Sequence, residues 1–291
     1  MQALQQLPYN RKLTLACSLQ QSSRSARLRI RAAADDAGEA AETPTLYGDW
    51  REFRAKLVAD AGKVNWASRV SEENSKLLQV QNPSLASEET WAHATTQPEV
   101  GGLLLASSDG PAVLNTDQYW QAVVLLVQHS AAGSVGLILN RPSGLKLGVG
   151  RGGLKFGIIG APAGMQETFA ASRVYCGGMV RQDVFHILHG HNLEGAVEVA
   201  PGVYVGGEAA AVKAAGGGLI PTDNFKFFCG AMVWEGSELQ QEVARGAWYT
   251  AAGSRNLCLK QCLQLPKPLW REVLGLMGGD YSAIAKEDEL D

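Results

Sequence analysis

The sequence lacks a hydrophobic run long enough to cross a membrane, because apolar stretches such as residues 122–127 fall far short of the roughly 20 residues that a transmembrane helix needs. It contains only five cysteines, and none of them forms a Cys-x-x-Cys motif. This usage excludes a disulfide framework of the secreted type and a closed cysteine zinc site. Cys258 and Cys262 lie four residues apart, as they would on one face of a helix, and a buried apolar role is favoured over a redox role.

Sequence signatures of catalysis and cofactor binding are also missing or incomplete. The nucleophile motif Gly-x-Ser-x-Gly does not occur, and no nucleophile, base and oxyanion donor form a recognisable set. Residues 148–153 match Gly-x-Gly-x-x-Gly, but a dinucleotide site needs a strand before that string and a helix after it, and loop residues stand in both places. A flexible glycine-rich loop is therefore favoured, and we expect no cofactor.

Three histidines, at positions 186, 189 and 191, suggest a comparison with metal sites. His186 and His189 would point to opposite faces of a strand, and no acid at ligand spacing completes a set, although Cys176 could lie near. We expect no metal site. Glu238 and Glu242 are one helical turn apart, as paired catalytic carboxylates would be, but a cap charge and a solvated helix face are the favoured interpretation. No catalytic residue is assigned.

Acidic residues are absent before Asp35. Residues 1–34 carry six basic residues and many Ser, Gln and Ala, which is typical of an organellar transit peptide; a basic tail without fixed structure is the alternative. Without this segment the chain keeps 20 basic and 29 acidic residues, a formal net charge of −9. That balance argues against a broad electrostatic grip on nucleic acid, so direct nucleic-acid binding is not expected.

Composition divides the rest of the chain into three parts. Residues 35–97 are expected to form a linker and a helical N-terminal arm, residues 98–285 the main domain, and residues 286–291 an acidic tail. In the arm, Asp49 precedes apolar residues at helical spacing, which predicts an amphipathic helix over residues 50–61. The apolar residues of that helix are Trp50, Phe53, Leu57 and Val58.

The main domain contains short apolar runs that are typical of buried strands. These runs are residues 102–106, 122–128, 135–139, 174–178, 184–189 and 197–205. The second and third are separated only by a short loop containing Gly133, which predicts an antiparallel hairpin. Residues 206–218 leave helix and loop open, and residues 257–265 leave strand and helix open. Residues 268–277 predict a helix that begins with Pro268 and presents one apolar face.

Residues 225–250 form the stretch around which the domain is organised. The aromatic run that begins at Phe225 predicts a buried strand, and Gly230 within it indicates a bulge. Ser237 and Gln240 fit the capping box of a short helix, and Gly246 fits the left-handed residue that ends one. Two large aromatic residues flank this helix and are expected to pack into the core: Trp234 and Trp248.

Several segments match one known family in order and spacing. They are Gly102-Leu-Leu-Leu-Ala106, residues 123–129 with Gly136-Leu-Ile-Leu-Asn-Arg-Pro142, Tyr175-Cys-Gly-Gly178 with Leu188-His189, and the span from Trp234 to Trp248. This ordered set resembles the AlgH/YqgE-like proteins, and residues 49–57, 248–252 and 269–281 resemble the plastid branch of that family. Two positions depart from the family pattern: Met179 replaces the proline of Gly-Gly-Pro, and Val233 replaces the glycine before Trp234.

The resemblance implies an α+β fold in which a largely antiparallel sheet curls into a pseudo-barrel with flanking helices. Members of this family are often described as transcriptional regulators, but the resemblance implies no established activity and no catalytic residues. We therefore expect a non-enzymatic binding or regulatory protein of the chloroplast stroma, with a protein or a small molecule as its partner. The alternative is a hydrolase-like enzyme with a pocket near His189 and Trp234.

Two kinds of candidate surface residue follow from these hypotheses. His189 and Trp234 are candidates for a pocket. A local basic strip lies in the span without acids between Asp117 and Glu167, and it consists of Arg141, Lys146, Arg151 and Lys155. The strip could meet an anionic partner, whereas a solvated loop is the favoured interpretation.

The composition of residues 1–34 generates a prediction about import. A fluorescent fusion of the whole chain is expected to enter the plastid stroma and to lose roughly its first 34 residues, since transit segments are removed after import. Microscopy and N-terminal sequencing of the recovered protein would measure both events. A fusion that lacks residues 1–34 serves as the control, and a cytosolic signal from the full-length fusion would contradict the prediction.

Overall fold

The computed structural model describes residues 50–62, 65–149, 152–154 and 161–287. The expected transit peptide and most of the expected acidic tail lie outside these ranges, as do Asp49, Arg151 and Lys155. The described strands are β1 (Ala92–Ala94), β2 (Leu103–Ala106), β3 (Val123–Ser130), β4 (Gly133–Ile138), β5 (Pro142–Lys146), β6 (Arg173–Cys176), β7 (Val180–His189), β8 (Ala196–Ala200), β9 (Val203–Gly206), β10 (Phe225–Glu235) and β11 (Trp248–Gly253).

Helices surround these strands. They are α1 (Trp50–Gly62), α2 (Glu72–Gln81), α3 (Pro83–Ala86), α4 (Gly110–Leu114), α5 (Met165–Thr168), α6 (Glu208–Gly216), α7 (Glu238–Ala244), α8 (Arg255–Leu259), α9 (Leu269–Met277) and α10 (Gly279–Glu287), with short 3-10 turns at Trp66–Ser68, Asp117–Tyr119 and Thr222–Asn224. Of the segments left open by the sequence, residues 206–218 contain helix α6, whereas residues 257–265 contain only the end of α8 and otherwise form neither helix nor strand. None of the described helices is long and apolar enough to cross a bilayer.

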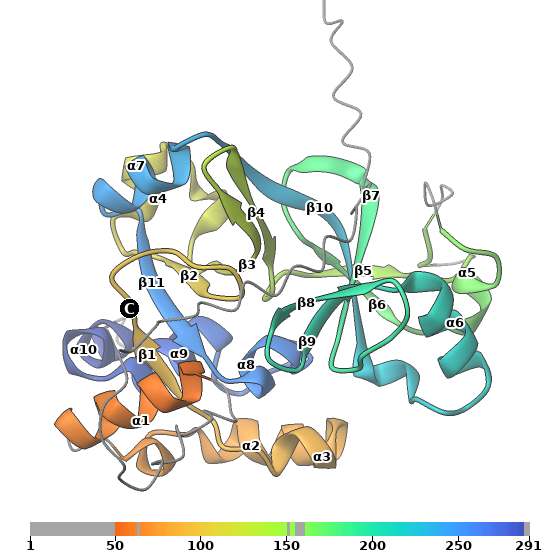
Figure 1. Ribbon diagram of the computed structural model, residues 1–291, viewed down its shortest axis with the longest axis horizontal. Coiled ribbons are helices and arrows are strands. Elements are labelled where there is room, and N and C mark those ends of the chain that lie inside the picture. Colours follow the sequence, from red (N-terminus) through yellow and green to blue (C-terminus); the bar gives the residue numbers. More distant parts are fainter. Residues whose placement is uncertain (1–49, 63–64, 150–151, 155–160, 288–291) are drawn as a thin grey trace, which may run out of the picture. The chain divides into compact units, whose positions relative to one another are not determined.

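The described strands form one sheet with the order β1-β11-β2-β3-β4-β10-β7-β9-β8, and β5 and β6 branch from it (Figure 1). Every strand pair is antiparallel except β6 with β10. The predicted α+β class and the hairpin of β3 and β4 are confirmed. The sheet curls, since a Cβ on Gly101 would lie 2.2 Å from the Val199 carbonyl oxygen at β8. However, no hydrogen-bonded pairing between described strands joins β8 to β1, so the sheet is not closed into a barrel.

Strand β10 connects the two halves of the sheet. Its first half pairs with β7 and β6, and its second half pairs with β4. Between the halves, the register shifts at Gly230, which has φ +70° and confirms the predicted bulge. A Cβ at Gly230 would lie 2.6 Å from the Gly178 carbonyl oxygen, so glycine is required there by both conformation and space.

The side chains of the strands contribute to three separate hydrophobic cores. One lies between the sheet and α9, another lies beneath α7, and the third lies beneath α5 and α6, which pack beside β6 (Figure 1). Because successive residues of a strand face opposite sides, Phe227 joins the third group and Phe228 the first. In α9, Trp270, Val273 and Leu274 are buried as predicted, and the indole of Trp270 donates to the Ala106 carbonyl oxygen at 2.8 Å.

Helix α1 confirms the predicted helix but reverses its expected face. Phe53 and Leu57 are 51% and 53% exposed, whereas Arg51 and Ala55 are buried. Arg51 donates to the carbonyl oxygens of Gly101, at 3.0 Å, and of Val100, so a polar side chain and not the apolar stripe anchors the helix. Buried backbone carbonyls need a donor, and Arg51 supplies one to the two residues that lie just before β2.

The arm also contributes to the sheet. Strand β1, within residues 35–97, pairs with β11 through Ala92 and Gly253. Helix α2 begins at a cap in which Ser71 Oγ accepts the Asn74 N–H at 3.3 Å. Strand β1 is therefore a hydrogen-bonded part of the sheet, although it lies before the main domain expected from residue 98.

The close approach of β10 to Gly178 generates a stability prediction. A Cβ at Gly178 would lie 2.1 Å from the Ala231 carbonyl carbon and 2.3 Å from the Met232 nitrogen, and backbone atoms of a paired strand cannot move aside. Gly178→Ala is expected to cost about 3 kcal/mol of unfolding free energy or more. Gly246→Ala meets no atom within 4 Å and strains only the backbone at φ +81°, so about 1–2 kcal/mol is expected. Urea denaturation compares the two variants, and equal midpoints would refute the steric argument.

Candidate functional site

A groove of about 330 Å³ lies at the end of β10 beside α7. We call it the β10 groove and define it by its lining residues: Tyr119, Val180, Met232, Val233, Trp234, Glu238, Gln241, Glu242 and Arg245. These residues come from β10, from α7, from the start of β7 and from the 3-10 turn after α4. The predicted candidate Trp234 thus lies at a surface cavity, although its own side chain is buried.

One carboxylate holds two tryptophans behind the groove. Glu242 Oε2 accepts the indole N–H of Trp234 at 2.8 Å and that of Trp248 at 2.7 Å. The two indole rings pack edge to face with centroids 6.3 Å apart. Both tryptophans are buried, as predicted. The interpretation of Glu242 as a solvated helix charge is wrong, because the carboxylate is the shared acceptor of two donors that would otherwise be buried without a partner.

Helix α7 presents that carboxylate, and its ends are only partly as predicted. Gly246, with φ +81°, confirms the left-handed residue after the helix. The capping box is wrong: Ser237 makes no cap bond to a backbone N–H, and instead its Oγ accepts from Gln241 Nε2 at 3.0 Å. Glu238 Oε2 accepts the Glu235 N–H at 2.7 Å in its place. The left-handed Gly236 before the helix directs the backbone away from the capping geometry that sequence spacing suggested.

The rim of the β10 groove carries two exposed valines, and most of the charged side chains in its lining are acidic. Val180 and Val233 are 43% and 45% exposed, and they come from neighbouring strands. Glu238 and Glu242 line the groove together with a single cation, Arg245. Burial, and then the Glu242 and Cys176 charges, raise the pKa of the Tyr119 hydroxyl, so that this side chain stays neutral and can donate a hydrogen bond.

His189 is buried at the other end of β10, where it pairs with Phe225. Its Nδ1 accepts the His191 N–H at 3.3 Å, and its Nε2 donates to the Gly206 carbonyl oxygen at 2.9 Å. Burial lowers the pKa of His189, which keeps the ring neutral in this tautomer. Both nitrogens are thus bound by backbone. Trp234 lies nine positions after Phe225 in β10, about 30 Å along an extended strand, so His189 and Trp234 share no pocket.

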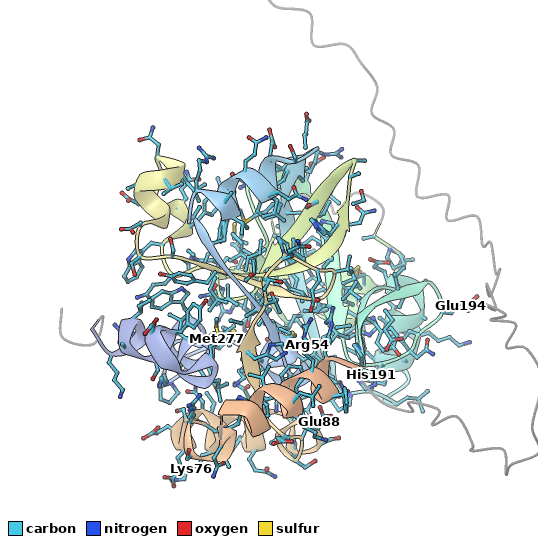
Figure 2. All side chains as sticks on the ribbon, turned by 60° about the vertical axis from the view of Figure 1, so that its left-hand side comes forward. Arg54, Lys76, Glu88, His191, Glu194 and Met277 are labelled. Atoms are coloured by element: carbon cyan, nitrogen blue, oxygen red, sulfur yellow. The ribbon has the colours of Figure 1, made fainter. Side chains whose placement is uncertain are left out.

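His191 lines a smaller cavity of about 60 Å³ between the end of β7, α8 and the turn of α2 into α3. Arg255 in that cavity binds Glu88 at 2.6 Å and the Gly190 carbonyl oxygen at 3.2 Å. Figure 2 labels Glu88, which binds Arg255, and His191, which lines the cavity with Arg255. Burial, followed by the charges of His189 and Arg255, lowers the pKa of His191. The described residues hold no group of three or more His, Cys, Asp or Glu that could bind a metal ion.

The expected basic strip is only partly described. Arg141 is half-buried and donates to the carbonyl oxygens of Trp120 and Asn140, and burial lowers the pKa of its guanidinium. Lys146 is exposed at the end of β5, opposite Arg173. Arg141 therefore serves the local fold, while Lys146 lines a separate surface cavity with Arg173. The sequence did not point to Tyr119 or Val180, because they lie in segments far apart along the chain that come together only in the folded protein.

The shared carboxylate generates a prediction. Glu242→Ala removes the acceptor of two indole N–H groups and is expected to cost about 2 kcal/mol of unfolding free energy. Glu242→Gln keeps an acceptor oxygen and should cost clearly less. Ser237→Ala, which removes no cap bond, should stay within about 0.5 kcal/mol of the parent. Denaturation followed by tryptophan fluorescence measures all three, and equal stability of the Glu242→Ala and Ser237→Ala variants would contradict the assigned role.

Known proteins match this fold and this order of segments. A protein from Chlorobium limicola called "UPF0301 protein" is 30% identical over 193 residues, which is 65% of this chain and 92% of that protein. One of the same description from Chlamydia muridarum is 29% identical over 199 residues, or 66% and 93%. A crystal structure of a Corynebacterium diphtheriae protein shares the fold with a TM-score of 0.50 at 16% identity, covering 65% of this chain and 93% of that one. The sequence profile described as AlgH-like matches residues 105–282, and the chain therefore belongs to the AlgH-like family.

Proposed function

We propose that the protein is a non-enzymatic binding protein whose β10 groove takes a segment of a partner protein. The segment carries an aliphatic side chain next to a lysine or arginine. The observation behind the proposal is the pair of exposed valines, Val180 and Val233, on adjacent strands at the rim of a groove with an acidic wall.

The apolar part of the groove supports the aliphatic side chain of the partner. Val180, Met232 and Val233 line the cavity, and burying one aliphatic side chain against such a surface contributes about 1.5–3 kcal/mol. The rim is also held in place, because β10 pairs with β4 from Met232 to Glu235 and Glu242 binds the two tryptophans behind it. A preformed surface loses little conformational entropy on binding.

The charges of the groove support the basic residue of the partner. The lining of the groove contains two carboxylates, Glu238 and Glu242, and one cation. Glu235 is exposed just before α7 and adds a third negative charge nearby. Charges of this kind contribute more to orientation and to the association rate than to affinity, and salt screens them. Binding through this groove should therefore weaken as ionic strength rises.

A regulatory role in the plastid stroma completes the proposal. It is supported by the composition of residues 1–34 and by the resemblance to the plastid branch. The net charge of −9 without that segment favours regulation through a protein partner over direct contact with DNA. The hydrolase-like alternative depended on a pocket shared by His189 and Trp234, and these residues lie at opposite ends of β10.

A displayed peptide library selected on the full chain tests the groove. Peptides with an aliphatic residue beside a Lys or Arg are expected to be enriched, and Val233→Asp should weaken their binding at least 10-fold, because it places a desolvated charge against the aliphatic side chain. Fluorescence anisotropy of one selected peptide at two salt concentrations measures the effect.

Val80→Asp is the matched control, since Val80 is 83% exposed on α2 and lies outside the groove. It should bind the peptide like the parent chain. Equal binding by the Val233→Asp and parent chains would place the peptide elsewhere and would refute the proposed site.

A further inference from the structure

Two cysteines lie side by side on the parallel strands β6 and β10. Cys176 ends β6, and its direct partner in the register is Cys229 of β10. Adjacent strands are about 4.8 Å apart, which falls within the Cα separation of about 4.4–6.8 Å that a disulfide spans. All four cysteines among the described residues are free thiols in this structure.

The neighbouring residues show that the two side chains share a face of the sheet. Two positions earlier, the paired residues Val174 and Phe227 both lie in the core beneath α5 and α6. The pair between them, Tyr175 and Phe228, lies in the opposite core with ring centroids 5.5 Å apart. Because faces alternate along a strand, Cys176 and Cys229 return to the side of Val174 and Phe227, and Cys229 packs against that core.

The electrostatics of the two thiols agree with this placement. Burial and then the Cys176 charge raise the pKa of the Cys229 thiol to about 11, so the two sulfurs lie within electrostatic reach. Cys176 is half-buried, its Sγ donates to the Gly178 carbonyl oxygen at 3.7 Å, and its charge acts on the guanidinium of Arg141.

We propose that Cys176 and Cys229 form a reversible redox site that closes to a disulfide by exchange with a low-molecular-weight disulfide. The Cys176 thiolate attacks one sulfur of the small disulfide, the S–S bond breaks, and one thiolate leaves. The deprotonated Cys229 sulfur then attacks Cys176 Sγ and expels the second thiolate. Two protein thiols lose two electrons, the small disulfide gains them, and the two protons pass to the released thiols.

The remaining described cysteines lack this arrangement. Cys258 is buried in α8, where burial raises its pKa to about 11, and Cys262 is buried beside the ammonium group of Lys226. Neither lies opposite another cysteine in a strand register. The new bond would cross-link β6 to β10 one residue before the bulge at Gly230. The inference does not depend on the proposed peptide groove.

Peptide mapping of the full chain tests the site. The reduced protein is equilibrated in buffers of reduced and oxidised glutathione, quenched with acid, alkylated and digested. Two thiols are expected to be lost together, and the cross-linked peptide should join Cys176 to Cys229. Cys229→Ser should stop at a glutathione adduct on Cys176, whereas Cys176→Ser should lose reactivity at both positions. Cys17→Ser, which changes a cysteine outside the described residues, should leave the cross-link intact.

The map of the parent chain decides the question even if a serine variant fails to fold. Full retention of both thiols in a folded protein at a large excess of oxidised glutathione would overturn the proposal. So would a cross-link that joins either residue to Cys258 or Cys262. Circular dichroism of the oxidised sample shows that the protein remained folded during equilibration.

Discussion

The buried ammonium group of Lys226 is the interaction on which the position of β10 depends. It lies in the core, donates to the carbonyl oxygens of Lys260 at 2.9 Å and Leu139 at 3.3 Å, and lies 4.8 Å from the ring centre of Tyr175. Burial lowers its pKa, because desolvation disfavours the charged form. Each buried donor left without a partner would cost about 1–3 kcal/mol, so the end of β4 and the segment after α8 are held where their carbonyls meet this group.

A second buried polar group extends this constraint to the N-terminal helices. Lys260 pairs with Glu272 of α9 at 2.7 Å, and the other oxygen of Glu272 accepts from Asn74 of α2 at 2.8 Å. Removing Lys260 or Glu272 would leave the buried charge of the other unpaired, which is strongly destabilising. The AlgH-like profile begins at residue 105, yet α2 and β1 complete the hydrogen bonds of α9 and β11. Helix α2 of the N-terminal arm is thus part of the same polar network as the family domain.

Strand β10 brings the functional features together because its two halves have different neighbours. Before Gly230 it lies beside β6 and β7, where the cysteine pair and the backbone-bound His189 are found. After Gly230 it lies beside β4, and the groove with the Trp234–Glu242–Trp248 contact begins. A single bulge therefore separates a redox-competent sulfur pair from an apolar, acidic surface. This separation explains why a pocket shared by His189 and Trp234 does not exist.

The sequence by itself determined the features that local pattern controls: the buried strand at 225–235 with its bulge, the hairpin of β3 and β4, the helix after Pro268 and the family. These follow from side-chain periodicity and from glycine's freedom at positive φ, which are properties of neighbouring residues. Tertiary structure alone decided which side chains contact one another and which faces are buried. The acceptor for both indoles, the reversed face of α1, the open sheet and the pairing of Cys176 with Cys229 depend on how whole segments are placed in space. Sequence spacing carries no information on such contacts, because strand pairing and burial fix them only when the whole sheet forms.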